Sequence, residues 1–317
     1  MAKPSPNLTP PPQPHLLVLE LWGIGDLALA VPFLRAAALH ARVTLVGQPH
    51  AAPLLARFAP SVEFIPLVVP WTRFRGKYRL HRWPWRELWQ ATRALRQRRF
   101  DCGTSARPDP RDHLLLALGA VKRRVGFSRA GSGVLLQTSV PRPARPHRAA
   151  HWAALASVFG WECPPLQVRD PGRAGKHVVI HPGAAQSVRR WPRARFEVLA
   201  DRLRSAGWRV TMLAEETTDL EQLLDTLASA TRFIGNDSGP GHLAALLDVP
   251  TFTIFGPQLP ELFAPTHPTA AWIEGAPCPH KPCFDRCRFA EPHCLLQNEV
   301  DAVWSRVAAW LPAPAAR

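Results

Sequence analysis

Long hydrophobic runs are missing from this sequence of 317 residues. No apolar stretch approaches the ~20 residues that a membrane-spanning helix requires. The proline-rich segment 1–14 also lacks the apolar core of a signal peptide. We therefore expect a cytoplasmic protein without a spanning helix, and a disordered N-terminus over residues 1–14.

Lysine and acidic residues are also scarce. The chain has 24 Asp and Glu against 39 Lys and Arg, of which five are lysine, and its formal net charge is +15. Such a charge attracts nucleic acid, anionic lipid or an anionic substrate. The positive charge is concentrated in segment 71–100, which has ten basic residues, four tryptophans and a single acidic residue, Glu87.

Interleaved Arg and Trp in segment 71–100 leave two alternatives open. The segment is either a solvated basic helix whose tryptophans pack on a sheet, or a surface that docks on anionic membrane. No recognised nucleic-acid-binding module accompanies it, so we expect no nucleic-acid partner.

What the chain does contain is a repeated alternation of apolar strands and helices. Strands are predicted at 15–22, 42–46 and 62–69, with helices at 27–40 and 51–58 between them, and a second series begins at residue 177. This order predicts α/β domains with doubly wound parallel sheets. We expect a Rossmann-like domain over 15–145, a linker over 146–176 and a second such domain over 177–317, facing each other across a ligand cleft. A last helix at 298–311 is expected to pack across the hinge.

The segment Asn-Asp-Ser-Gly-Pro-Gly-His-Leu-Ala at 236–244 carries the most specific chemistry. It follows an apolar strand and opens a helix, which Ser238 can cap. Gly239 and Gly241 allow a ligand to approach the backbone closely. Unpaired N–H groups at such a helix start suit a phosphate or diphosphate, although an ordinary strand-to-helix turn has the same pattern.

Three segments together resemble glycosyltransferase family 9, the lipopolysaccharide heptosyltransferases. Residues 23–32, with Gly-Ile-Gly-Asp and a later Val-Pro, are similar to the family's Gly-Asp…Thr-Pro signature. Residues 181–192, His-Pro-Gly…Arg-Arg-Trp-Pro, resemble its His-Pro-Gly…Lys-Arg-Trp-Pro segment, and 236–244 with Phe-Gly-Pro at 255–257 resemble its third block. The three occur in the family's order and span nearly the whole chain.

The resemblance implies a GT-B architecture, with the acceptor on the N-terminal domain and the sugar nucleotide on the C-terminal domain. It also implies an inverting, metal-independent transfer of heptose from ADP-heptose, or a related nucleotide sugar, to the lipopolysaccharide inner core. The acceptor would be a lipid-linked saccharide, and the protein would work peripherally at the inner face of the inner membrane. No cofactor is expected for catalysis.

Transfer in one displacement requires a base on the acceptor hydroxyl and stabilisation of the departing diphosphate. Asp26, after the first strand, is the candidate base; alternatively, it only caps the following helix. Arg189, in place of the family's lysine, is expected to stabilise the diphosphate together with the backbone of Ser238 and Gly239. The other expected donor-site residues are Gly25, Gly183, Asp237, which would orient the loop, and His242.

Two departures from the family pattern leave the function open. The connection 213–219 is short where the family carries a helix–strand unit on the nucleoside side, so that Glu215 or Glu216 would have to reach the ribose. Gln258 stands where threonine is common after Gly-Pro. A family 9 transferase for another nucleotide sugar and a degenerate, non-catalytic phosphate- or nucleotide-binding protein are therefore alternatives.

Four of the six cysteines lie within seventeen residues near the C-terminus: Cys278, Cys283, Cys287 and Cys294. A cytoplasmic setting argues against a disulfide framework. Four thiolates would satisfy tetrahedral zinc, although the spacing is irregular for a zinc finger. A structural zinc and a set of reduced or partly paired thiols are the two alternatives.

Overall fold

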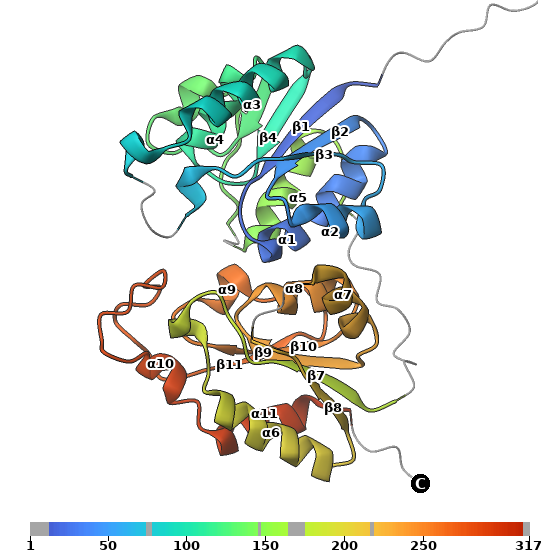
Figure 1. The fold of residues 1–317 in the computed structure, drawn as a ribbon, viewed down its shortest axis with the longest axis vertical. Coiled ribbons are helices and arrows are strands. Elements are labelled where there is room, and N and C mark those ends of the chain that lie inside the picture. Colours follow the sequence, from blue (N-terminus) through green and yellow to red (C-terminus); the bar gives the residue numbers. More distant parts are fainter. Residues whose placement is uncertain (1–12, 74–77, 145–146, 164–174, 216–218, 313–317) are drawn as a thin grey trace, which may run out of the picture.

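The computed structural model describes residues 13–73, 78–144, 147–163, 175–215 and 219–312. These residues form two α/β domains, stacked one on the other (Figure 1). Of the segment 1–14 that was expected to be disordered, residues 1–12 lie outside this part of the chain, and so do residues 146 and 164–174 of the expected linker. Within the described part, no helix is long and apolar enough to cross a membrane.

The first domain is built on a six-stranded parallel sheet in the order β3-β2-β1-β4-β5-β6. All six residues of β1 are buried, as expected for a strand covered on both faces. The strand order reverses between β1 and β4, the position where doubly wound sheets bind ligands. The strands are β1 (His15–Glu20), β2 (Arg42–Gly47), β3 (Glu63–Pro66), β4 (Cys102–Ser105), β5 (Arg123–Gly126) and β6 (Thr138–Ser139). The helices are α1 (Ile24–Ala38), α2 (Ala51–Phe58), α3 (Trp85–Gln97), α4 (Pro110–Leu118) and α5 (Arg148–Val158).

The second domain repeats this plan with a five-stranded parallel sheet in the order β11-β10-β9-β7-β8. Its order reverses between β7 and β9, so the loops after these two strands lie at the corresponding edge, where doubly wound sheets bind ligands. The strands are β7 (His177–His181), β8 (Arg209–Met212), β9 (Arg232–Asn236), β10 (Thr251–Phe255) and β11 (Ala271–Glu274). The helices are α6 (Arg193–Ser205), α7 (Leu220–Ala228), α8 (Gly239–Leu246), α9 (Pro260–Phe263), α10 (His293–Leu296) and α11 (Val300–Trp310).

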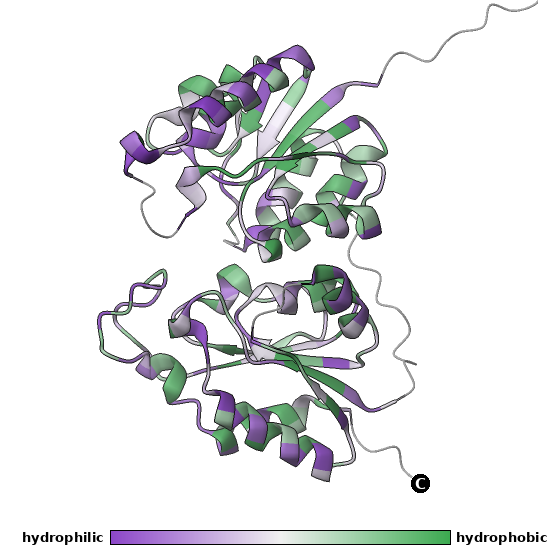
Figure 2. Cartoon of the chain, in the orientation of Figure 1, coloured by the Kyte–Doolittle hydropathy of each residue, from purple (hydrophilic) through white to green (hydrophobic). Residues whose placement is uncertain are grey.

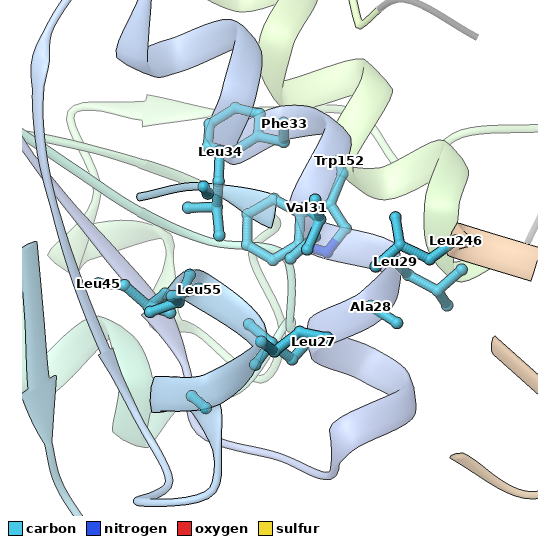
Figure 3. Close-up of a cluster of buried hydrophobic side chains, with 14 of the residues drawn as sticks. Leu27, Ala28, Leu29, Val31, Phe33, Leu34, Leu45, Leu55, Trp152 and Leu246 are labelled. Carbon is cyan, nitrogen blue, oxygen red and sulfur yellow. The ribbon is translucent and has the colours of Figure 1, made fainter. Parts of the chain in front are cut away.

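Helix α1 joins the two domains. Its residues 27–31 are all buried, because the helix is apolar around its circumference and is covered on several sides. Figure 3 shows Leu29 of α1 beside Leu246 of α8, and Trp152 of α5 beside Val31. One apolar cluster therefore runs through both domains, and α1 packs directly on α8.

Helices α5 and α11 bear on the expected domain connections. Helix α5 lies within the expected linker. The ring centroids of its Trp152 and of Phe33 in α1 are 5.0 Å apart, and Trp152 belongs to the apolar cluster that runs through both domains. The last helix, α11, does not cross the hinge but packs on α6 and β11. Its Val303 and Val307 are fully buried in the second domain's own core, which explains this position.

Candidate functional site

The N-termini of α1 and α8 meet across the two domains. A Cβ atom added to Gly239 would lie 2.3 Å from Cγ2 of Ile24, and one added to Gly25 would lie 2.8 Å from Cδ2 of His242. Both positions require glycine because the two helices approach too closely for a side chain. Gly239 was expected to make room for a ligand, which stays a prediction; in the structure its close neighbour is Ile24 of the other domain.

Asp26 lies in the first turn of α1 and pairs with an arginine that was not predicted from the sequence. Oδ1 of Asp26 accepts a hydrogen bond from Nη2 of Arg107, which follows β4. The same guanidinium lies 4.4 Å from the centroid of the Trp22 ring, a cation–π contact that helps to fix it. The cap of α1 is Gly23, so the carboxylate of Asp26 is occupied with Arg107 rather than with capping. Its role as a base stays a prediction.

Glu20 is a buried acid behind this pair, and it too was not predicted. It ends β1, and its Oε1 accepts a hydrogen bond from the backbone N–H of Trp22 at 3.1 Å. Burial, and next the charge of Asp26, raise the pKa of Glu20 to about 8. The sequence signal was a glutamate at the end of an otherwise apolar strand, a position that places the carboxyl group at the ligand-binding edge.

Asp112 of α4 is a second buried acid in this region. Its oxygens accept hydrogen bonds from Trp71 Nε1 and Ser105 Oγ, both at 2.9 Å. Burial, and then the charge of Asp109, raise the pKa of Asp112 to about 7. The carboxyl groups of Glu20 and Asp112 therefore keep their protons to a higher pH than exposed acidic side chains do.

Replacing Glu20 with glutamine is expected to make the protein more stable at high pH. Because the pKa of Glu20 rises on folding, the native state binds more protons, and its contribution to the free energy of unfolding is lost as the pH rises from about 4.5 through about 8. Glu20→Gln should match the parent near pH 5 and exceed it above pH 8 by up to about 5 kcal/mol. Denaturant unfolding at several pH values measures this. Glu87→Gln, at an exposed position, is the control, and parallel profiles for both variants would contradict the prediction.

Arg189, at the end of the turn Ser187–Arg189, is held by two carboxylates. Its Nε and Nη2 donate to Oδ1 and Oδ2 of Asp285, both at 2.6 Å, and its Nη1 donates to Oδ2 of Asp237 at 3.1 Å. Burial raises the pKa of Asp237 to about 6, although Arg189 opposes the shift. The structure therefore brings together Arg189 and Asp237, two of the expected donor-site residues, and adds Asp285, 96 residues further along the chain from Arg189.

Ser238 and His242 flank the first turn of α8. Ser238 occupies the cap position, but its side chain makes no capping hydrogen bond, contrary to expectation. Its Oγ donates instead to the carbonyl oxygen of Asn236 at 3.3 Å. Burial lowers the pKa of His242 to about 4, so this imidazole is neutral at pH 7, and its Nδ1 has no partner among the described residues.

Gly183, after β7, lies against the short connection that follows β8. A Cβ atom there would be 2.0 Å from the carbonyl oxygen of Glu215, so the two backbones are in direct contact. The Glu215 side chain pairs with Arg190 at 3.5 Å. Of the two residues considered for a ribose contact, Glu215 is thus engaged with Arg190, and Glu216 lies outside the described residues.

The four clustered cysteines line one small cavity of about 10 Å³ together with His280 and His293. All four are free thiols. A cavity of this size has room for about one water molecule. Within the part of the chain that the structure describes, no group of three or more Cys, His, Asp or Glu is arranged to hold a metal ion. The structural zinc stays a prediction, which metal analysis of the purified protein tests.

Comparison with known proteins finds similarity to glycosyltransferases. The model of glycosyltransferase family 9 (heptosyltransferase) matches residues 213–293. Lipopolysaccharide heptosyltransferase 1 of Pseudomonas aeruginosa is 27% identical over 155 residues, which cover 42% of this chain and 43% of that protein. The matched stretch thus spans less than half the length of this curated relative.

Solved structures match over a larger share. Escherichia coli ADP-heptose lipopolysaccharide heptosyltransferase II has a TM-score of 0.68 at 20% identity, covering 94% of this chain and 98% of that one. Escherichia coli heptosyltransferase WaaC with ADP-2-deoxy-2-fluoro heptose has a TM-score of 0.70 at 17% identity, covering 93% and 99%. The fold is therefore that of the GT-B glycosyltransferases. Within this class, the chain is similar to the lipopolysaccharide heptosyltransferases of glycosyltransferase family 9.

Proposed function

We propose that this protein transfers a heptose from ADP-heptose to the inner core of lipopolysaccharide. The observation that carries the proposal is that the segments 23–32 and 236–244 meet where the two sheets face each other. Asp26 of the first domain lies close enough to Arg189, Asp237 and His242 of the second for its charge to act on all three. A base and a phosphate-binding helix start are thereby brought to one place from two domains.

The proposed reaction is an inverting, metal-independent displacement. Asp26 accepts the proton of the acceptor hydroxyl as its oxygen bonds to the anomeric carbon, and the bond from that carbon to the diphosphate breaks. ADP leaves with the electron pair of that bond. The Arg189 guanidinium and the backbone N–H groups of Ser238 and Gly239 stabilise the charge that develops on the diphosphate. Arg107 holds the Asp26 carboxylate in place beforehand.

Isothermal titration with ADP, UDP and GDP sugars, followed by a transfer assay, tests the proposal. We expect binding of ADP-heptose and heptose transfer to lipopolysaccharide that lacks this sugar. Binding of a UDP or GDP sugar instead would select a family 9 transferase of another specificity. Binding without transfer would indicate a degenerate member of the family. If the protein bound none of these nucleotide sugars, both transferase hypotheses would be rejected.

The proposal extends to the membrane that carries the acceptor. The four tryptophans of segment 71–100 divide into two kinds: Trp71 and Trp83 pack in the first domain, whereas Trp85 and Trp89 are 55% and 61% exposed. Arg93 lies over the exposed Trp89 ring at 5.5 Å.

The α3 ribbon is mostly hydrophilic along its length (Figure 2). Exposed Trp beside Arg supports docking of α3 on an anionic membrane at its inner, cytoplasmic face. Arg75 and Lys77 of the same basic segment lie outside the described residues.

Combining Arg86→Glu with Trp89→Ala is expected to weaken vesicle binding more than tenfold. Each basic residue near an anionic surface contributes about 1 kcal/mol, and reversal of the charge adds repulsion. Sedimentation with phosphatidylglycerol vesicles at low and moderate salt measures the effect, which salt should reduce. The matched control, Arg35→Glu with Leu39→Ala, changes another exposed pair and should bind like the parent. No binding by the parent, or equal loss in the control, would contradict docking through α3.

A further inference from the structure

Asp285 brings the cysteine-rich loop, residues 278–294, into contact with Arg189, one of the expected donor-site residues. It lies between Cys283 and Cys287, and its side chain is only 5% exposed. Its two carboxylate oxygens accept parallel hydrogen bonds of 2.6 Å from Nε and Nη2 of Arg189. Such a bidentate pair fixes the plane of the guanidinium as well as its position.

Neighbouring residues hold Asp285 in this position. The side-chain amide of Gln258 donates to its Oδ1 at 3.2 Å, and Gln258 is itself buried. Phe284 and Asp285 have φ angles of 48° and 66°, a left-handed conformation that residues with side chains rarely adopt. The loop therefore keeps an unfavourable backbone shape while it presents this carboxylate, and such a shape persists only where the surroundings impose it.

We infer that Asp285 is a positioning residue that orients Arg189 toward the diphosphate of the donor. A guanidinium has five N–H groups. The bonds to Asp285 and Asp237 use three of them, which leaves one N–H on each terminal nitrogen for phosphate oxygens. This inference rests on the proposed function, because it assigns Arg189 to the diphosphate of that same site.

A competing arrangement would have the opposite consequence. If Asp285 were a counter-ion that the diphosphate displaces, its removal would free Arg189 and tighten binding. The burial of Asp285 and its bond to the buried Gln258 favour a fixed support over a displaceable group. Because coupling between two sites is reciprocal, donor binding should in turn stabilise the cysteine-rich loop that carries Asp285.

Asp285→Asn is the central test, since it keeps the shape of the side chain and removes its charge. We expect ADP to bind about tenfold more weakly, measured by isothermal titration. Glu291→Gln removes an equal charge from an exposed position of the same loop and should bind ADP like the parent. Arg189→Lys cannot form the bidentate pair, so Asp285→Asn added to it should cause little further loss.

Several outcomes would overturn the inference. Unchanged or tighter ADP binding by Asp285→Asn, or losses that simply add in the double variant, would show that Asp285 does not act through Arg189. If the parent binds no ADP, the proposed function fails, and the coupling is judged without ligand. In that case Asp285→Asn should speed thiol labelling of Cys283 and Cys287 relative to Glu291→Gln, and equal rates would refute the coupling.

Discussion

Asp26→Asn is expected to lower kcat for heptose transfer by about 10²–10⁴-fold, the usual contribution of a general base. Asparagine has nearly the same shape as aspartate but cannot accept the proton of the acceptor hydroxyl. The donor is expected on the second domain, so its Kd should stay within about twofold of the parent value, because the variant removes no group assigned to donor binding. A transfer assay and titration with ADP-heptose measure the two quantities separately.

The control for Asp26→Asn should remove a carboxylate that also pairs with an arginine. Asp225 pairs with Arg57 of the other domain at 2.6 Å and is 74% exposed. Asp225→Asn should leave transfer unchanged, since exposed ion pairs contribute little to stability. If Asp26→Asn weakened donor binding as much as it slowed transfer, Asp26 would be a structural partner of Arg107 and not the base.

Gly183→Ala is expected to lower the free energy of unfolding by about 3 kcal/mol, the upper range for overpacking. The added Cβ would lie 2.0 Å from the carbonyl oxygen of Glu215, and this atom belongs to the backbone and cannot rotate away. Denaturant unfolding measures the change. The loop after β7 and the connection after β8 would have to separate, so ADP binding should weaken as well.

Gly133→Ala makes the same substitution where space exists. Its Cβ would meet Cβ of Ser128 at 3.6 Å, an ordinary van der Waals contact. We expect a change of less than about 0.5 kcal/mol, as for most surface substitutions. Equal destabilisation by both variants would mean that the contact between Gly183 and Glu215 is not the cause.

The paired charges at the site bear on how each substrate of the proposed reaction would bind. In the structure, Asp26 is bound to Arg107 and Arg189 to two aspartates, so both ionic groups are satisfied before any ligand arrives. An acceptor hydroxyl would share Asp26 with Arg107, because Arg107 contacts Oδ1 and leaves Oδ2 to accept a hydrogen bond. The donor would use the remaining N–H groups of Arg189. Neither substrate of the proposed reaction therefore needs an ion pair to break when it binds.

Strand and helix order could be predicted from local pattern alone. Apolar runs of strand length and the all-round apolar helix at 27–31 depend on neighbours within a few residues, and the structure confirms the parallel sheets. Asp26 and Asp237 were also recognisable, since each follows a strand whose end lies at the expected ligand-binding edge, whereas Arg189 was singled out by the resemblance to family 9. Their grouping at one place follows from the topology of parallel sheets.

The partners of those residues could not be predicted in this way. Arg107 reaches Asp26 across 81 residues, and Asp285 reaches Arg189 across 96. Gly25 and Gly239 could be picked out as site residues from the sequence. The residue that packs closely against each of them, however, belongs to the other domain. Which groups meet depends on where distant strands return to the sheet and on how the two domains pack. Local sequence pattern therefore specifies the elements and their ligand-binding edges, whereas long-range packing selects the charges that hold the site in place.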